Sequence, residues 1–222
     1  MGKMVGFRAN GGKTDGYLSE PAPGSGAKGV IVIQEWWGLN GHVKDVADRF
    51  AKAGFTALAP DLYHGTVAKS PDEAKKLLMA LSIAQAETDL RGAVAHLRGL
   101  TGKPVGTVGF CMGGALSLFA ACKNGKDIGA CVIYYGGHSK VQYDFDGLTA
   151  PVQGHWAEHD DSANTVARQV EAALKERGKT YEFYRYPGTS HAFFNDQRPE
   201  VYDPKAAQLS WERTVAFFNA HL

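Results

Sequence analysis

A cysteine flanked by glycines has the residue type and spacing of a nucleophile. Within Thr107–Ala115, the residues Gly109, Cys111 and Gly113 form the pattern Gly-x-nucleophile-x-Gly. A strained turn of this kind, between a strand and a helix, needs residues without bulk on either side of the nucleophile. Free N–H groups at the start of the helix stabilise a thiolate and later an oxyanion. We therefore predict that Cys111 attacks a carbonyl carbon and that the N–H of Met112 helps to bind the oxyanion.

Other roles for this segment are less consistent with its residues. Most cysteines are buried structural residues, and we interpret Cys122 and Cys131 in this way. A dinucleotide loop is excluded because the segment lacks Gly-x-Gly-x-x-Gly and the next strand, which runs into Gly136, offers no acidic residue for a ribose. The segment also lacks the Gly-Lys-Ser/Thr of a phosphate-binding P-loop.

A thiol with a pKa of about 8.5 is mostly protonated at neutral pH, so Cys111 needs a neighbouring base. Where a nucleophile occupies such a turn between a strand and a helix, the acid and then the histidine follow it along the chain. His191 follows the last predicted strand and is the predicted base. Three carboxylates in Glu158–Asp161 compete to orient it. We favour Asp160, with Asp161 second, because Asp161 is well placed as an N-cap or first-turn acid of the following helix.

The segment His155–His159 also matches the zinc-binding pattern H-x-x-E-H. That chemistry needs both histidines on one face of a helix. Here the segment completes the apolar strand that begins at Pro151, and no downstream helix offers an obvious third ligand. We therefore expect neither a metal nor an organic cofactor.

A second group of polar residues, Gln34–Gly38, follows the apolar strand 29–33. Glu35 is therefore expected at the carboxyl edge of the sheet, near Cys111. A carboxylate in that place is either a paired structural charge or a group that takes the proton of the thiol. The backbone N–H of Trp36 is expected to complete the oxyanion hole with that of Met112.

These residues resemble the dienelactone hydrolase family, a cysteine branch of the α/β-hydrolase fold. The resemblance rests on Gln34–Gly38, Ala59–Tyr63, Gly109–Gly114 and the loop of His191. It implies that Cys111 is the nucleophile of an ester or lactone hydrolase, that His191 is its base and that Asp160 orients the base. It also implies that Glu35 holds the resting thiol, which ionises when substrate binds.

The chain departs from the family in the residues expected to bind substrate. Members that act on dienelactone hold its carboxylate with arginines, one of them four residues after the histidine. Here that position is Asn195, and Arg198 lies nearby but out of register. Lys75 and Lys76 offer only point charges without the bidentate fork of arginine, so the substrate stays open among dienelactone, other lactones and acyclic esters. Further candidates for the substrate pocket are Trp37, Tyr63, Phe193 and Asn195.

Strands and helices alternate from residue 28 onward and must position these loops. Strands are predicted at 29–33, 55–59, 105–110, 130–135, 152–156 and 181–186. Helices are predicted at 40–53, from Ser70, through 86–97, and at 113–122, 163–177 and 204–220. This alternation predicts an α/β fold with a mostly parallel sheet and helices on both faces. We expect one α/β-hydrolase domain over 1–222, with an edge hairpin that Pro21–Gly26 separates from the main fold.

Composition narrows the possible partners. With 24 Lys and Arg against 23 Asp and Glu, the net charge of +1 provides no basic surface for nucleic acid or an anionic membrane. Three cysteines cannot all be paired, which favours a reducing compartment. The N-terminus lacks the apolar region of a secretory signal. We expect a cytoplasmic protein, with a monomer favoured, that acts on a small molecule.

Two other functions stay open. A non-catalytic protein that binds a small acid would fit the replacement of a substrate-binding arginine by Asn195. A redox-sensing thiol would fit a cysteine at a helix N-terminus, which is readily oxidised. The redox function needs a second cysteine close to Cys111, and Cys122 lies some three helical turns away.

Overall fold

The protein is built around a mostly parallel sheet. The computed structural model describes residues 2–9, 12–23, 28–138 and 140–222, and within them the sheet has eight strands in the order β1-β2-β4-β3-β5-β6-β7-β8. The strands are β1 (Lys3–Ala9), β2 (Gly12–Ser19), β3 (Gly29–Ile33), β4 (Thr56–Pro60), β5 (Val105–Phe110), β6 (Ile128–Tyr134), β7 (Val152–His159) and β8 (Tyr181–Ser190). The predicted hairpin, β1 and β2, pairs antiparallel at one edge, and β3 to β8 run parallel.

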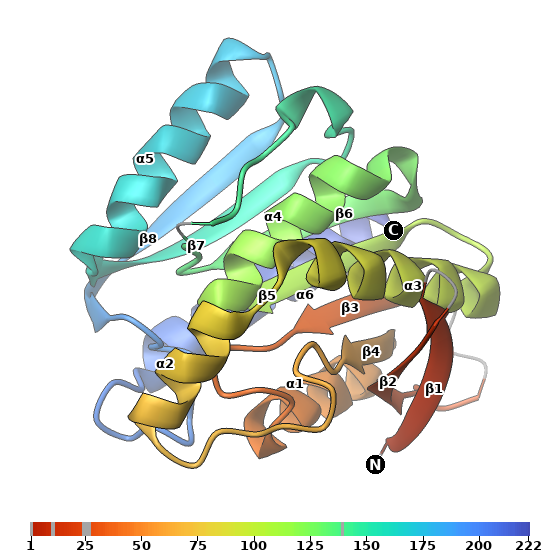
Figure 1. The fold of residues 1–222 in the computed structure, drawn as a ribbon. Helices are drawn as coiled ribbons and strands as arrows, with labels where there is room; N and C mark the ends of the chain where they lie inside the picture. The colour runs from red at the N-terminus through yellow and green to blue at the C-terminus, as the bar shows by residue number, and fades with distance from the viewer. Residues whose placement is uncertain (1, 10–11, 24–27, 139) are drawn as a thin grey trace.

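Helices cover both faces of the sheet. They are α1 (Gly41–Lys52), α2 (Pro71–Ala80), α3 (Ile83–Thr101), α4 (Met112–Asn124), α5 (Asp161–Glu176) and α6 (Pro204–His221). Figure 1 shows α3, α4 and α5 on one face, with α1 and α6 behind the sheet. The ring of Phe50 on α1 packs on those of Trp211 and Phe218 on α6, with centroids 4.6 and 5.8 Å apart. The predicted α/β class is confirmed.

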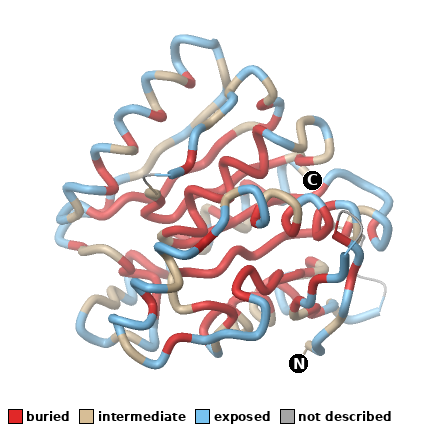
Figure 2. The backbone as a smooth tube through the Cα atoms, in the orientation of Figure 1, coloured by how far each residue is buried: buried red, intermediate tan, exposed pale blue. Residues whose placement is uncertain are grey.

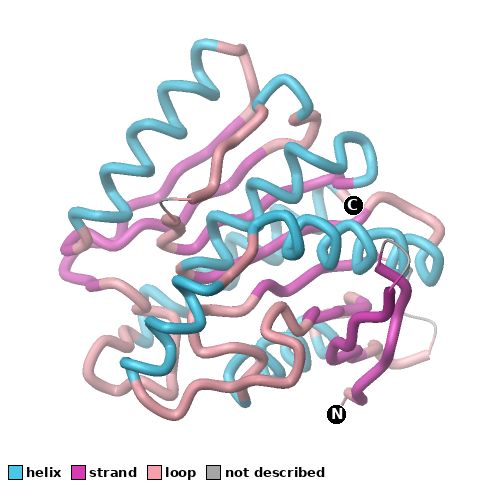
Figure 3. The backbone as a smooth tube through the Cα atoms, viewed as in Figure 1, coloured by secondary structure: helices cyan, strands magenta, loops and turns pink. Residues whose placement is uncertain are grey.

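The middle strands form the core, as their continuous apolar runs predict. Every residue of β3 and β5 is buried (Figure 2), which is typical of parallel strands covered on both faces. Because these strands are parallel, their carboxyl ends share one edge, where loops from distant parts of the chain gather (Figure 3).

Several boundaries differ from the predicted ones. β7 and β8 continue to His159 and Ser190, so that His191 directly follows a strand. β6 begins at Ile128, two residues earlier than predicted. In the linker predicted at Pro21–Gly26, residues 24–26 lie outside the described part of the chain. No helix among the described residues is long and apolar enough to cross a membrane.

Candidate active site

Cys111 occupies a strained turn between β5 and α4. Its backbone has φ 56° and ψ −119°, and its N–H donates to the carbonyl of Tyr134 at 3.0 Å. Non-glycine residues rarely adopt positive φ, and such strain is concentrated at functional sites. The side chain is partly exposed. The structure therefore presents a thiol at the N-terminus of α4, as the glycine pattern predicts.

Two glycines allow this turn, which we call the elbow (Gly109–Gly113). A Cβ added to Gly109 would lie 1.8 Å from the carbonyl oxygen of Gly113. A Cβ added to Gly113 would lie 2.4 Å from the carbonyl oxygens of Ile33 and Gln34. Because all of these neighbours are backbone atoms, neither collision can be relieved by turning a side chain.

Gly109→Ala is therefore expected to destabilise the protein. Forcing an extra methyl into a packed site costs about 1–3 kcal/mol, and the contact with Gly113 places this substitution at the upper end. Gly99→Ala is the matched control: it lies on α3 with nothing within 4 Å of an added Cβ, and alanine in a helix is favoured over glycine by about 0.5–1 kcal/mol. Urea unfolding of both variants measures the effect. Equal midpoints for the two would contradict this account of the elbow.

His191 and Asp160 meet at the carboxyl edge of the sheet. Nδ1 of His191 lies 2.5 Å from Oδ2 of Asp160, while Oδ1 of Asp160 accepts the N–H of Ala163 at 3.1 Å. Asp160 is thus the N-cap of α5. Of the two places predicted for Asp161, N-cap or first-turn acid, the second is confirmed, because Asp161 is the first residue of α5. One carboxylate can cap and orient at once because its two oxygens face different partners.

The surroundings of His191 favour its protonated form. Burial alone would lower the pKa of the imidazole, but hydrogen bonds to Asp160 and Cys111, together with their negative charges, raise it to about 10. The ring also lies 5.0 Å from that of Tyr135. A proton given up by the thiol would therefore be held well on His191.

Glu35 is buried, with 2% of its surface exposed, and its two oxygens have separate donors. Nδ2 of Asn195 donates to Oε2 at 2.9 Å, and the hydroxyl of Tyr135 donates to Oε1 at 3.4 Å. Burial, followed by the charge of Glu35, raises the pKa of Tyr135 well above its usual value, so that the hydroxyl stays a donor. Asn195, which sequence reasoning placed in the substrate pocket, holds Glu35 in position.

Two residues near Glu35 were missed by sequence reasoning. Tyr135 follows β6 directly and has φ 38°, and its place at the carboxyl end of a strand was the available signal. His42 is 1% exposed on α1, and its Nδ1 lies 3.4 Å from Oδ1 of Asp196. Burial lowers the pKa of His42, while the charges of Glu35 and Asp196 oppose this effect. The position of His42 at the start of α1, just before its apolar residues, gave no sign that its ring would lie close to Glu35 and Asp196.

A cavity of about 230 Å³ connects these groups. It is lined by Glu35, Trp36, Cys111, His191, Ala192 and Arg198. Trp36 therefore borders the space where its N–H is expected to act. Met112 is the first residue of α4, and the N–H of a first helical residue has no acceptor within its helix. The cavity thus brings together a thiol, a histidine, a carboxylate and an arginine.

The other candidates lie at different distances from this cavity. Tyr63 is buried, and its hydroxyl donates to Sδ of Met112 at 3.5 Å. Trp37 borders a neighbouring cavity of about 330 Å³ together with Arg198. Phe193 has no exposed surface and packs against Tyr135 and Tyr186, with centroids 5.5 and 5.0 Å apart, so it belongs to the core rather than to a pocket wall. The lysines considered as substitutes for arginine, Lys75 and Lys76, are exposed on α2 and do not line the Cys111 cavity.

The two histidines of the zinc-like pattern, His155 and His159, lie too far apart to bind one metal ion. Both belong to β7, where four residues span about 13 Å. His155 is fully buried and bonds Tyr186 and Gln153 at 2.8 Å each, whereas His159 is exposed. Within the described ranges no group of three or more His, Cys, Asp or Glu side chains is arranged to hold a metal.

The remaining two cysteines are core residues, as predicted. Burial raises the pKa of Cys122 to about 12 and that of Cys131 to about 11. Cys122 lies further along α4 by some 16 Å from Cys111, at 1.5 Å per residue, and a disulfide needs Cα atoms within about 7 Å. All three cysteines are free, and Cys122, the partner considered for the redox hypothesis, is out of reach of Cys111.

Comparison with known proteins gives matches over the whole fold. The model of the dienelactone hydrolase family matches residues 14–222. The chain is 39% identical to the protein usf of Aquifex pyrophilus and 34% identical to a putative carboxymethylenebutenolidase of Aquifex aeolicus, each over 100% of both chains. Among solved structures, a putative dienelactone hydrolase from Klebsiella pneumoniae has a TM-score of 0.88 and 27% sequence identity, and the match covers 99% of this chain and 98% of that chain.

Proposed function

Because the chain belongs to the dienelactone hydrolase family, we propose that it hydrolyses small esters or lactones with the thiol of Cys111. The observation that carries this proposal is the strained turn that places Cys111 at the start of α4. There the thiol is hydrogen-bonded to His191, and Nδ1 of His191 lies 2.5 Å from Oδ2 of Asp160. A nucleophile, a base and a residue that orients the base are the minimum for acyl transfer.

The first half of the reaction forms a thioester. Cys111 gives its proton to His191, and its sulfur attacks the carbonyl carbon. The negative charge that develops on the carbonyl oxygen is bound by the N–H groups of Trp36 and Met112. When this intermediate collapses, the C–O bond to the alcohol breaks, and the departing oxygen takes the proton from His191. In a lactone the alcohol stays attached to the acyl group.

The second half returns the enzyme to its resting state. His191 takes a proton from a water molecule, and the resulting hydroxide attacks the thioester carbonyl. The carbon–sulfur bond breaks, the acid leaves, and the thiolate of Cys111 recovers a proton from His191. Asp160 stabilises the imidazolium in both halves.

Glu35 is assigned a part in the resting state. Asn195 and Tyr135 hold its carboxylate at the wall of the Cys111 cavity. We propose that it accepts the proton of the thiol when the side chain of Cys111 turns away from His191. Asn195→Leu removes the closer of the two donors to Glu35 and leaves the hydrogen bond from Tyr135. The rate at which iodoacetamide alkylates Cys111 in this variant should differ from the rate in the parent protein.

Arg198 is the cation proposed to recognise an anionic substrate. It lines the Cys111 cavity, whereas Lys75 and Lys76 do not. A hydrogen bond to a charged group contributes about 1.5–3 kcal/mol, so Arg198→Gln should raise KM for a substrate with a free carboxylate by about 10- to 100-fold. Lys75→Gln is the matched control. Equal KM increases for a neutral and an anionic ester would contradict this role.

A panel of substrates tests the proposed function. Lactones and short acyl esters, with and without a carboxylate, are compared before and after treatment with iodoacetamide. The proposal expects hydrolysis of several members and its loss when Cys111 is alkylated. Hydrolysis that survives full alkylation of Cys111 would refute it.

We also propose that the protein is located in the cytoplasm. Its three free thiols support this placement, because the cytoplasm is a reducing compartment.

A further inference from the structure

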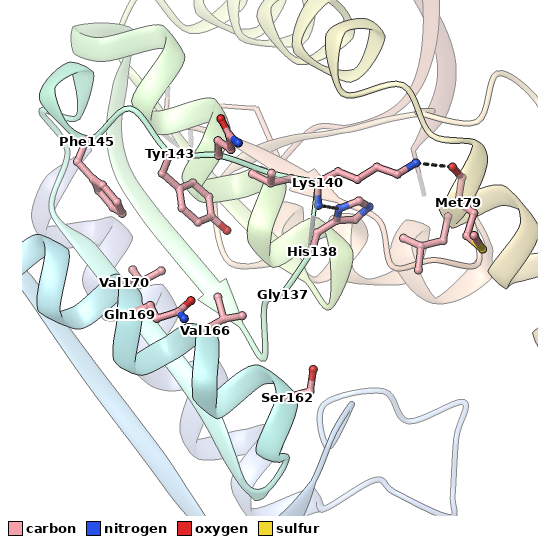
Figure 4. Close-up of a pocket in the computed structure, with 13 residues that line it drawn as sticks. Met79, Gly137, His138, Lys140, Tyr143, Phe145, Ser162, Val166, Gln169 and Val170 are labelled. Atoms are coloured by element: carbon pink, nitrogen blue, oxygen red, sulfur yellow. Dashed lines mark hydrogen bonds between the residues drawn. The ribbon is translucent and has the colours of Figure 1, made fainter.

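A groove larger than the Cys111 cavity lies between the end of α2, the segment from β6 to β7, and α5. Its volume is about 720 Å³, against about 230 Å³ at Cys111. In Figure 4, Tyr143 and Phe145 point from the connecting segment toward α5. Val166 and Val170 lie opposite them on α5. Small-molecule sites occupy about 300–1,000 Å³, so the groove can hold a ligand group for which the Cys111 cavity is too small.

The walls of the groove are largely apolar. Val166 and Val170 are one helical turn apart on the same face of α5, and Leu78 and Met79 face them from α2. Met79 is 64% exposed at the rim, although it is a large apolar side chain. Nζ of Lys140 reaches the carbonyl oxygen of Met79 at 2.5 Å and ties the connecting segment to α2 (Figure 4). Among the described residues the lining contains no carboxylate, and the ammonium group of its Lys140 is already bonded to Met79, so the largely apolar walls suit an uncharged chain or ring.

The groove begins next to the reacting groups. Gly137 lines it, and the N–H of Gly137 donates to the carbonyl oxygen of Cys111 at 3.4 Å. A Cβ at Gly137 would lie 3.6 Å from Val166, so the absence of a side chain keeps this end open. Ser162 also lines the groove and lies two residues after Asp160. An ester whose carbonyl is held at Cys111 is therefore placed to extend into the groove.

We propose that the groove binds an apolar chain of the substrate, so that the preferred substrates are esters or lactones with a medium-length alkyl or aryl group. This inference rests on the proposed function of Cys111. Each methylene that leaves water strengthens binding by up to about 4-fold. A chain of eight carbons therefore gains substantially over an acetyl group, even when only part of it enters the groove.

Val166→Trp tests the proposal by filling the groove. Its kcat/KM for ethyl octanoate or octyl acetate should fall by about 10- to 100-fold, while that for ethyl acetate stays within about 2-fold; titration of the released acid measures all three. Gln169→Trp, at an exposed position on the same wall, serves if Val166→Trp does not fold. Arg168→Trp places the same side chain on α5 at an exposed position outside the groove lining and should change none of the rates.

A binding measurement separates this proposal from the function of Cys111. Calorimetry with octanoate requires no turnover, so it can be performed even if the protein hydrolyses no ester. Octanoate should bind the parent protein and Arg168→Trp alike, and at least 10-fold more weakly to Val166→Trp. Equal binding by all three proteins, or no binding to the parent, would overturn the proposal. Normal octanoate binding without any ester hydrolysis would instead refute the proposed function alone.

Discussion

Cys111→Ala is expected to lower kcat/KM for p-nitrophenyl acetate by about 10⁴-fold or more. The substitution removes the sulfur that is proposed to form the thioester. The residual rate is expected to come from the proposed oxyanion donors, Trp36 and Met112, and from substrate binding. Because alanine is smaller than cysteine and Cys111 is partly exposed, the fold should be preserved. Stopped-flow release of p-nitrophenol measures the effect.

The matched control for this experiment is Cys122→Ala. Cys122 is a buried thiol on the same helix, with a pKa raised to about 12 by burial, and such thiols are chemically inert. Its replacement should cost stability through lost packing while leaving kcat/KM within about 2-fold of the parent. A large loss of activity in Cys122→Ala, with Cys111→Ala unaffected, would reverse the assignment of the two cysteines.

Asp160→Asn is expected to lower kcat by about 10³- to 10⁴-fold. Asparagine is as good an N-cap as aspartate, so the bond to Ala163 and the start of α5 are kept. The negative charge beside Nδ1 of His191 is lost, and with it the stabilisation of the imidazolium. An NMR titration of the imidazole protons should show the pKa of His191 falling from about 10. An unchanged titration would contradict this role of Asp160.

The same variant should change how stability depends on pH. The pKa of His191 is raised in the folded chain to about 10, above the value of about 6.5 for an unfolded chain. This contribution to the free energy of unfolding is therefore complete below pH 6.5 and is lost as the pH rises through about 10. Urea unfolding should separate parent and Asp160→Asn most at about pH 6 and least above pH 10.

Much of the site could be predicted because its signals are local. The glycines around Cys111 follow from backbone collisions within a few residues and with the neighbouring strand β3. That Cys111, Asp160 and His191 meet follows from the rule that loops at the carboxyl ends of parallel strands gather at one edge. The fold class followed from the alternation of strands and helices. In each case the signal is a motif or a pattern of strands and helices that can be read without knowing which distant side chains touch.

The parts that could not be predicted depend on contacts between distant segments. Asn195 bonds Glu35 across 160 positions of the chain, and sequence spacing contains no trace of that pairing. Asp160 is both the N-cap of α5 and the partner of His191, and spacing along the chain gave no sign that one carboxylate has both contacts. Phe193 follows a site histidine, yet it turns into the core. The groove is formed by three segments, none of which suggests a binding site alone.

The most direct test of the central claim is to identify the residue that carries the acyl group. The protein is mixed with p-nitrophenyl acetate, quenched in acid within the first turnovers, digested and analysed by mass spectrometry. The proposed mechanism predicts a single acetyl group on the sulfur of Cys111. In the variant His191→Asn, acylation forced with excess ester should leave more of this acetyl group in place, because deacylation then lacks its base. Hydrolysis at the parent rate with no acetyl group on Cys111, or with the acetyl group on another residue, would contradict it.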